Sequence, residues 1–233
     1  MAGKTTRSNW SSIVLPLMRL FRLSRARRIK ALVPDIEHQF VCDLGGSLHY
    51  WEAVKSVINP LNLVILNVEE GRGLGYEPSA DERIVLYDGR RIPFEDGEID
   101  VLMCNSVIEH VPLSERGNLA KEIKRVSKCY VVQTPAYEFP LEPHFLVPFF
   151  HYLPRTIGRR LAPITPYCLI TRSSTETSRR TFDEIHLLTR GQMQSFFPEA
   201  RLVVERFLGI PKSYLCIGFN TDQKRSSAQP EKD

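Results

Sequence analysis

The chain has 233 residues, of which 42% are hydrophobic and 25% charged, and its net charge is +4. That size suits one α/β domain, with or without an insertion, and the composition excludes wholesale disorder. The five cysteines form no CxxC pair and the six histidines are dispersed, so we expect neither a disulfide framework nor a metal site. No apolar run approaches the ~20 residues of a membrane span.

The N-terminal segment is predicted to be a basic amphipathic helix from about Ser12 to Ala31, with Leu17, Leu20 and Phe21 on one face. An acid-free run there holds six basic residues: Arg19, Arg22, Arg25, Arg27, Arg28 and Lys30. Because these charges exceed the net charge of the chain, the remainder is net negative, which argues against a general nucleic-acid-binding domain. We favour a helix packed across the domain. Contact of residues 12–31 with an anionic membrane surface is the alternative, followed by nucleic acid.

Strand and helix patterns then alternate along the middle of the chain. Such alternation implies βαβ units and a mainly parallel, Rossmann-like sheet with helices on both faces. Short apolar stretches predict strands at Gln39–Leu44, Leu63–Leu66, Ile84–Tyr87, Asp100–Cys104 and Tyr130–Gln133. Helices are predicted at about Tyr50–Val57 and Ser114–Ser127.

The character of the sequence changes after Thr134, where prolines and aromatic residues replace the regular patterns. We therefore expect residues 135–188 to form a lid-like insertion without clear strands, which covers the substrate. The spacing of Thr189 and Gln192 predicts a capping box at the start of a short helix. Two final strands, Leu202–Phe207 and Tyr214–Phe219, would complete a seven-stranded sheet as an antiparallel hairpin. The domains predicted are thus 1–35 (basic helix), 36–221 (main domain) and 222–233 (flexible tail).

Polar residues and glycines follow the predicted strands and carry the expected chemistry. Asp43, Gly45 and Gly46 follow the first strand, where glycines let a ligand approach the backbone. The third glycine of a dinucleotide fingerprint is missing, and Asp43 would repel a pyrophosphate, so a ligand with an ammonium or sulfonium group is favoured. The other strand ends carry Asn67, then Asp88 and Gly89, then Asn105 and Ser106. Together they define one crevice at the carboxyl ends of the strands.

Three segments carry a resemblance to a known family. They are Asp43–Gly46, Asp88–Phe94 with Ile99–Val101, and Asn105–Val111, and they resemble class I S-adenosylmethionine-dependent methyltransferases, most closely the type 11 methyltransferase domain. The segments around Gln133–Pro135, Glu142–His144 and Phe182–Thr189 are similar to a bacterial subgroup of these enzymes.

The resemblance implies S-adenosylmethionine as cofactor and a role for each strand end. Asp43, Gly45 and Gly46 would border the methionine moiety. Asn67 would face the ribose, although the family usually has an acid there and Glu69 is an alternative. Asp88 and Gly89 would meet the adenine. Asn105 and Ser106 would line the floor under the sulfonium.

Candidate general bases are His110 and His144, whereas His186 is expected to be a packed histidine. Arg179 and Arg180 could bind an anionic acceptor, and the alternative is that both side chains are simply solvated. The sequence thus predicts a cytoplasmic methyltransferase. Its acceptor would be small or carrier-linked, with oxygen as the methylated atom, in glycan, lipid or secondary metabolism. The alternative is a non-catalytic accessory protein of the same fold that holds the cofactor.

Overall fold

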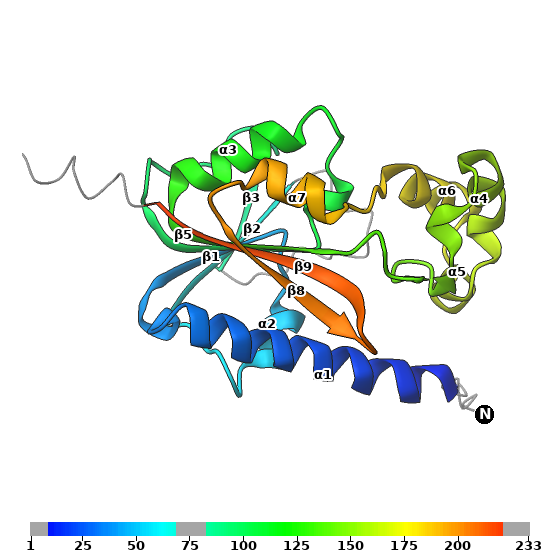
Figure 1. Cartoon of the computed structure of the whole chain (residues 1–233), viewed down its shortest axis with the longest axis horizontal. Coiled ribbons are helices and arrows are strands. Elements are labelled where there is room, and N and C mark those ends of the chain that lie inside the picture. Colours follow the sequence, from blue (N-terminus) through cyan, green and yellow to red (C-terminus); the bar gives the residue numbers. More distant parts are fainter. Residues whose placement is uncertain (1–8, 69–82, 221–233) are drawn as a thin grey trace, which may run out of the picture.

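The structure is a computed structural model that describes residues 9–68 and 83–220, with the side chains of residues 9–18 left out (Figure 1). Its centre is a seven-stranded sheet with the order β3-β2-β1-β4-β5-β9-β8. The parallel strands are β1 (Phe40–Leu44), β2 (Asn62–Val68), β3 (Ile84–Tyr87), β4 (Ile99–Asn105) and β5 (Ser127–Pro135). The hairpin of β8 (Arg201–Phe207) and β9 (Ile210–Phe219) adds the two antiparallel strands. The predicted fold class is confirmed.

The strand order places the switch point of the sheet between β1 and β4. The chain passes outward from β1 to β2 and β3, then crosses to the other side of β1 with β4. In open α/β sheets, ligands bind in the crevice that opens where neighbouring strands diverge at their carboxyl ends. Asp43 and Asn105 lie at those ends of β1 and β4, as the sequence predicted.

Helices cover both faces of the sheet (Figure 1). On one face lie α1 (Asn9–Leu32) and α2 (Leu48–Val54), whose buried residues Ile29, Trp51 and Val54 join the apolar side chains of that face. On the other lie α3 (Arg116–Val126) and α7 (Arg190–Phe196), which contribute Ile123 and Met193 to a second core. Strands covered on both sides need apolar residues throughout, which explains the continuous hydrophobic runs of β4 and β5.

The buried stripe of α1 differs from the predicted one. Leu20 is 56% exposed, and Ala26 and Ile29 are buried instead. The reason is that the C-terminal half of the helix packs against α2 and the sheet, so tertiary contacts and not the local apolar pattern select the buried face. Phe21 packs edge-on against Phe207, with ring centroids 5.4 Å apart.

The insertion forms a separate lobe beyond the carboxyl end of β5 (Figure 1). Its elements are β6 (Leu141–Glu142), β7 (Val147–Pro148), η4 (Phe150–Tyr152), α4 (Arg155–Leu161), η5 (Ala162–Ile164), α5 (Pro166–Thr171) and α6 (Thr175–Glu184). The lobe has its own core of Phe145, Phe150, Ala162, Cys168, Phe182 and Ile185. The expectation of a segment without strands was wrong, since β6 and β7 pair, and the segment is mainly helical. Its prolines begin helices: Pro154 and Pro166 stand at or next to the first helical position, where a missing N–H costs nothing.

Several local predictions are confirmed. Thr189 and Gln192 form the capping box at the start of α7. All five cysteines are buried and unpaired. Within residues 9–68 and 83–220, no helix combines the length and hydropathy that crossing a bilayer requires. Glu69 and the predicted tail at 222–233 lie outside the described residues.

Candidate active site

The turn after β1 is a tight backbone cradle that requires its two glycines. Gly45 has a left-handed φ of 71°, and a side chain there would overlap Val107. A Cβ on Gly46 would overlap the carboxyl group of Asp43. The Nδ2 of Asn67, at the end of β2, donates to the Gly46 carbonyl oxygen over 3.2 Å. The structure therefore brings together four of the predicted residues, and Asn67 braces the turn.

Asp43 is a buried carboxyl group with one oxygen left over. Its Oδ2 accepts a hydrogen bond from Trp51 Nε1 at 2.9 Å, whereas its buried Oδ1 has no partner among the described residues. Burial raises the pKa of Asp43 to about 7, and the hydrogen bond from Trp51 only partly opposes that shift. An approaching cation would stabilise the ionised form, so Asp43 is suited to an ammonium group.

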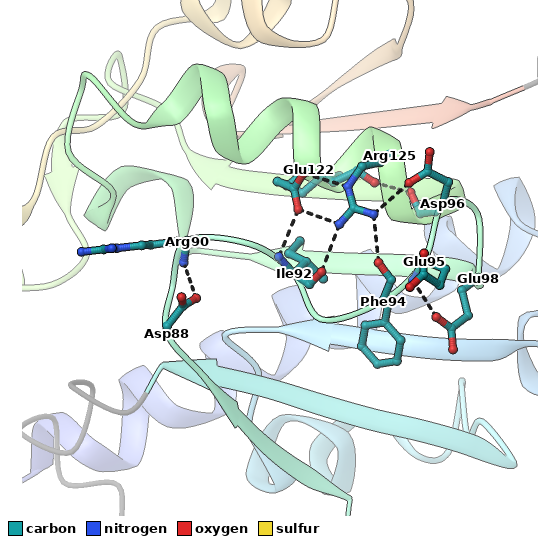
Figure 2. Close-up of polar contacts among 11 residues, drawn as sticks. Asp88, Arg90, Ile92, Phe94, Glu95, Asp96, Glu98, Glu122 and Arg125 are labelled. Carbon is teal, nitrogen blue, oxygen red and sulfur yellow. Dashed lines mark hydrogen bonds and ion pairs between the residues drawn. The ribbon is translucent and has the colours of Figure 1, made fainter.

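The loop after β3 carries Asp88 and Gly89 and is fastened to α3. Asp88 accepts a hydrogen bond from the backbone N–H of Arg90, and Gly89 has a φ of 78°. Figure 2 shows how Arg125 of α3 donates to the carbonyls of Ile92 and Phe94 and pairs with Asp96 and Glu122. Glu122 in turn accepts from the N–H of Ile92. These bonds fix the segment after Asp88, so the position of the Asp88–Gly89 turn is set by α3.

The end of β4 carries an amide without partners. Asn105 is partly buried, and its Oδ1 and Nδ2 are both shielded from solvent with no hydrogen-bond partner among the described residues. Such groups are rare in folded proteins because each costs desolvation energy. The next residue, Ser106, has a φ of 55°, which is uncommon for a residue with a side chain. Orphaned polar atoms beside a strained turn are typical of a site that awaits a ligand.

Ser106 is held from behind by a chain of buried polar groups that reaches α1. Its hydroxyl donates to Gln133 Oε1 over 3.2 Å, and its N–H donates to the Gln133 carbonyl oxygen. The same Gln133 Oε1 accepts from Arg25 Nη1 at 2.8 Å. Arg25 also forms a buried ion pair with Glu205 of β8 at 2.8 Å. Sequence reasoning counted Arg25 among the surface charges, and its partners lie more than 100 residues away, so no local signal revealed this role.

A second cluster forms where the lobe meets the sheet. Glu109 and His110 lie in the 3-10 helix η3 (Ile108–His110), and His144 comes from the lobe. The rings of His110 and His144 are perpendicular, with centroids 4.9 Å apart. One potential ligand atom from each of the three residues lies within 4.8 Å of the other two. The dispersed histidines had predicted no such group, because residues 34 positions apart in the chain meet only in the fold.

Two members of this cluster, Glu109 and His144, are each held by a further side chain. Glu109 is fully buried, and its Oε2 accepts from Thr134 Oγ1 at 2.9 Å, whereas Oε1 has no partner among the described residues. Glu142 Oε1 lies 2.7 Å from His144 Nδ1, and its Oε2 accepts from the N–H of Phe145. The sequence analysis missed the roles of Glu109 and Glu142. The spacing Glu142-Pro143-His144 was the available signal.

The electrostatics of the two histidines differ. Burial, together with the neighbouring charges of His144 and Arg116, lowers the pKa of His110 to about 4. Burial also disfavours the charged form of His144, but its hydrogen bond with Glu142 and the charges of Glu142 and Glu109 outweigh that effect and raise its pKa. At neutral pH, His110 is therefore uncharged.

The third histidine of the sequence analysis, His186, belongs to the support of the cluster. Its backbone N–H donates to the Glu109 carbonyl oxygen at 2.9 Å, and its ring Nδ1 lies 3.1 Å from the Glu184 carbonyl oxygen. The buried Arg116 joins the carbonyls of Glu109 and His186 through its Nη2. His186 is thus hydrogen-bonded, as predicted, but it is only half-buried, and its backbone helps to fix η3.

A cavity of about 910 Å³ opens between η3 and helices α4 and α6 of the lobe. Its lining includes His110, His186, Arg159, Arg179 and Arg180. Arg159 pairs with Asp183 at 2.7 Å, and Arg180 lies 3.6 Å from Glu184. Such a volume is ample for a small molecule or the end of a carrier.

Comparison with known proteins identifies a family that part of this chain resembles. A family model described as a methyltransferase domain matches residues 68–129, which include Asp88, Asn105 and His110. Residues 68–129 are therefore similar to the methyltransferase domain family, in agreement with the resemblance carried by Asp88–Phe94 and Asn105–Val111. This methyltransferase domain implies S-adenosylmethionine as its cofactor, and the buried atoms of Asp43 and Asn105 fit a ligand with charged and hydrogen-bonding groups.

Solved structures agree with that fold. A SAM dependent methyltransferase from Archaeoglobus fulgidus has a TM-score of 0.51 at 12% identity, with 89% of this chain and 100% of that chain covered. The small RNA methyltransferase HEN1 has a TM-score of 0.51 at 15% identity, with 95% of this chain but 27% of that chain covered. At these identities the likeness concerns the fold alone. No curated protein matches the chain.

Proposed function

We propose that this methyltransferase domain is an active enzyme that transfers a methyl group from S-adenosylmethionine to an oxygen of a small or carrier-linked acceptor. The observation that carries the proposal is the presence of two half-sites at the carboxyl ends of the strands. The strand ends hold unsatisfied polar atoms of Asp43 and Asn105, and the Glu109–His110–His144 cluster faces the cavity through His110. An accessory protein that only holds the cofactor would have no need of the second half-site.

On the cofactor side, each residue has a role that suits its surroundings. Asp43 Oδ1 would accept the ammonium group, and the turn at Gly45 and Gly46 would let the methionine moiety approach the backbone. Asn67 would brace that turn and contact the ribose. Asp88 and Gly89 would receive the adenine. Asn105 and Ser106 would form the floor under the sulfonium.

On the acceptor side, the residues would position a hydroxyl group and remove its proton. The bound cofactor supplies a methyl group on a positively charged sulfur, which is ready for direct displacement. Alignment of the reactants can then provide on the order of 7–11 kcal/mol of the barrier reduction. Since Nδ1 of His144 faces Glu142, its Nε2 is the nitrogen that remains for a proton of the acceptor. Neutral His110 would accept a hydrogen bond or shape the loop.

The proposed acceptor is a hydroxyl-bearing compound of glycan, lipid or secondary metabolism in a bacterium. Arg179 lines the cavity and forms no ion pair within residues 9–68 and 83–220, so it is the residue that would attract a carboxylate or phosphate on the acceptor. The buried, unpaired cysteines suit the reducing conditions of the cytoplasm, which is the location we propose.

Calorimetric titration and a methyl-transfer assay test this function in sequence. We expect the purified chain to bind S-adenosylmethionine with one-to-one stoichiometry and Asp43→Ala to weaken that binding. Label from radioactive S-adenosylmethionine should then appear in hydroxyl-bearing compounds of a cell extract. Binding without any label transfer would favour the accessory protein. Absence of binding, together with wild-type behaviour of Asp43→Ala, would refute both.

We also propose a weak attraction of α1 to anionic membranes. Arg25 and Lys30 are engaged with Glu205 and Glu37, but Arg19, Arg27 and Arg28 remain exposed. Nearby basic side chains contribute ~1 kcal/mol each at an anionic surface, and salt weakens them. Sedimentation with anionic vesicles should fall in the double variant Arg27→Gln/Arg28→Gln and stay unchanged in Lys121→Gln, on the opposite face. Equal sedimentation of both variants would refute the attraction of α1 to anionic membranes.

A further inference from the structure

We propose that Glu109, His110 and His144 bind a divalent transition-metal cation on the acceptor side of the active site. The role given to this cation rests on the proposed methyl transfer to oxygen, whereas its binding does not. The site lies where the lobe touches the end of the sheet, so that one ligand comes from the lobe and two come from η3.

The three ligand atoms are already close enough for a common ion. They lie within 4.8 Å of one another. Imidazole nitrogens and carboxylate oxygens bind such ions at about 2.0–2.2 Å, so two ligands of one ion are at most ~4.4 Å apart. A small rotation of one side chain closes the difference.

The surroundings of the cluster have the features of a built metal site. Thr134 occupies one oxygen of the fully buried Glu109, and the other oxygen has no partner among the described residues. Glu142 faces Nδ1 of His144, which orients the ring and leaves Nε2 as its ligand atom. Metal-binding histidines generally bond a carboxylate or carbonyl through their other nitrogen in this way. The unpartnered oxygen of Glu109 and the Glu142–His144 contact are therefore independent observations that indicate the same ligand.

The donor set selects the kind of ion. Magnesium and calcium prefer all-oxygen sites, whereas two imidazoles and one carboxylate suit zinc, manganese, iron, cobalt or nickel. Three protein ligands leave at least one position open, and His110 lines the 910 Å³ cavity from which a ligand would enter. A hydroxyl bound at that position would lose its proton more readily than a free one. With the cation bound, His144 Nε2 would hold the cation in place of taking the proton, and the proton would leave to solvent through the cavity. The acceptor class that fits is thus an alcohol or a phenol, held through the oxygen that receives the methyl group.

Cobalt(II) titration of tag-free, chelator-treated protein tests the site. We expect saturable one-to-one binding with visible absorption bands, and displacement by zinc. Glu109→Gln and His144→Gln should each weaken binding at least tenfold. His38→Gln, an exposed histidine outside the cluster, should bind as the wild type does. No saturable binding by the wild type, or wild-type binding by both ligand variants, would overturn the proposal.

Glu142→Gln covers the case in which a ligand variant fails to fold. This substitution keeps all three ligands and changes only the group that orients His144. Loss of such a supporting contact typically weakens metal binding 10- to 100-fold. Unchanged cobalt affinity in a folded Glu142→Gln protein would count against the site.

Parallel titration with S-adenosylmethionine separates this proposal from the proposed function. Cofactor binding and methyl transfer by a protein that binds no cation would refute the metal site and leave the enzyme standing. Cation binding by a protein that transfers no methyl group to oxygen would refute the proposed function and leave the metal site standing. Methyl transfer that chelation does not slow, in a protein that does bind cobalt, would overturn the role given to the cation.

Discussion

The proposed site has a cofactor side at the strand ends and an acceptor side at η3 and the lobe, and the two are built in different ways. On the cofactor side, backbone turns at strand ends form the site, and Gly45, Gly46 and Asp43 are close in sequence and in space. On the acceptor side, side chains form the site, and η3 and the lobe bring Glu109 and His144 together across 35 positions of the chain. The first side is set by short segments of a common fold. The second depends on a lobe with its own core.

This difference teaches where specificity resides in the molecule. The cofactor side is tied to the sheet through bonds such as that of Asn67 to Gly46, so it can vary little without loss of the fold. The lobe packs as a separate unit and joins the sheet at its base through Ala136 and Leu188. A binding surface for acceptors can therefore change in the lobe while the sheet stays intact.

The largest expected effect concerns His144 on the acceptor side. Loss of a general base typically lowers kcat by about 10²- to 10⁴-fold, so His144→Gln should do so while cofactor affinity stays within about twofold. In wild-type protein freed of metal by a chelator, the rate should rise with pH through a pKa above the ordinary 6.5 of histidine, because Glu142 raises it. Glu142→Gln should shift that rise to lower pH. If the rate of the Glu142→Gln variant had the same pH profile as the wild type, His144 would not be the group that removes the proton from the acceptor.

The next effect tests whether the cofactor side depends on distant support. Arg25→Ala removes the closer ion-pair partner of the buried Glu205, which keeps only Lys212 at 3.6 Å and the hydroxyl of Ser213, and it removes a hydrogen bond from Gln133. Removal of one partner of a buried pair typically costs about 3–5 kcal/mol when no other partner remains, so urea unfolding should show a loss of up to that size. Arg27→Ala, on the exposed side of the same helix, should change stability by less than ~0.5 kcal/mol. Equal losses in the two variants would contradict the buried role of Arg25.

Asp43 gives the cofactor side a pH dependence of its own. Its pKa in the folded chain is about 7 against an ordinary 3.8, so the folded state holds a proton that the unfolded state releases. Folding stability must then fall as pH rises from about 4 to about 7, by up to ~1.4 kcal/mol per pH unit, and level off above. Asp43→Asn should remove this dependence. Its stability relative to the wild type should therefore be greater at pH 8 than at pH 4. A constant difference at both pH values would refute the shifted pKa.

The smallest effect concerns the glycine cradle. Gly46→Ala would force a methyl group against Asp43. Overpacking of this kind costs about 1–3 kcal/mol, and we expect S-adenosylmethionine affinity to fall by about ten- to a hundredfold. Gly191→Ala in α7 meets no atom within 4 Å and serves as a matched control, with unchanged affinity. Equal affinities in the two variants would show that the turn after β1 does not hold the cofactor.

The sequence predicted the cofactor side better than the acceptor side for physical reasons. Strand ends such as Asp43, Asp88 and Asn105 follow from apolar runs and glycine positions, which are local signals. The class of the sheet followed in the same way, and the bounds of β3 matched the prediction. The roles of the glycine turn were also suggested by resemblance, and they stay predictions that the experiments above address.

The lobe and its contacts could not be predicted because they depend on tertiary packing. Prolines suggested irregular structure, although Pro154 and Pro166 begin helices. The pairing of Arg25 with Glu205 joins the first helix to the last hairpin over 180 positions. The buried Arg116 shows the same limit, since it satisfies three backbone carbonyls that no sequence pattern connects.

The anchorage of α1 has a consequence for anything that acts on its free end. The helix has 24 residues and so is about 36 Å long. Because Arg25 is fixed to Glu205 and Gln133, the helix is a rigid arm and not a flexible tether. A surface or partner that held its outer turns would set the direction in which the crevice faces. Through Gln133, a pull on that arm would also reach Ser106, at the end of β4 in the proposed site.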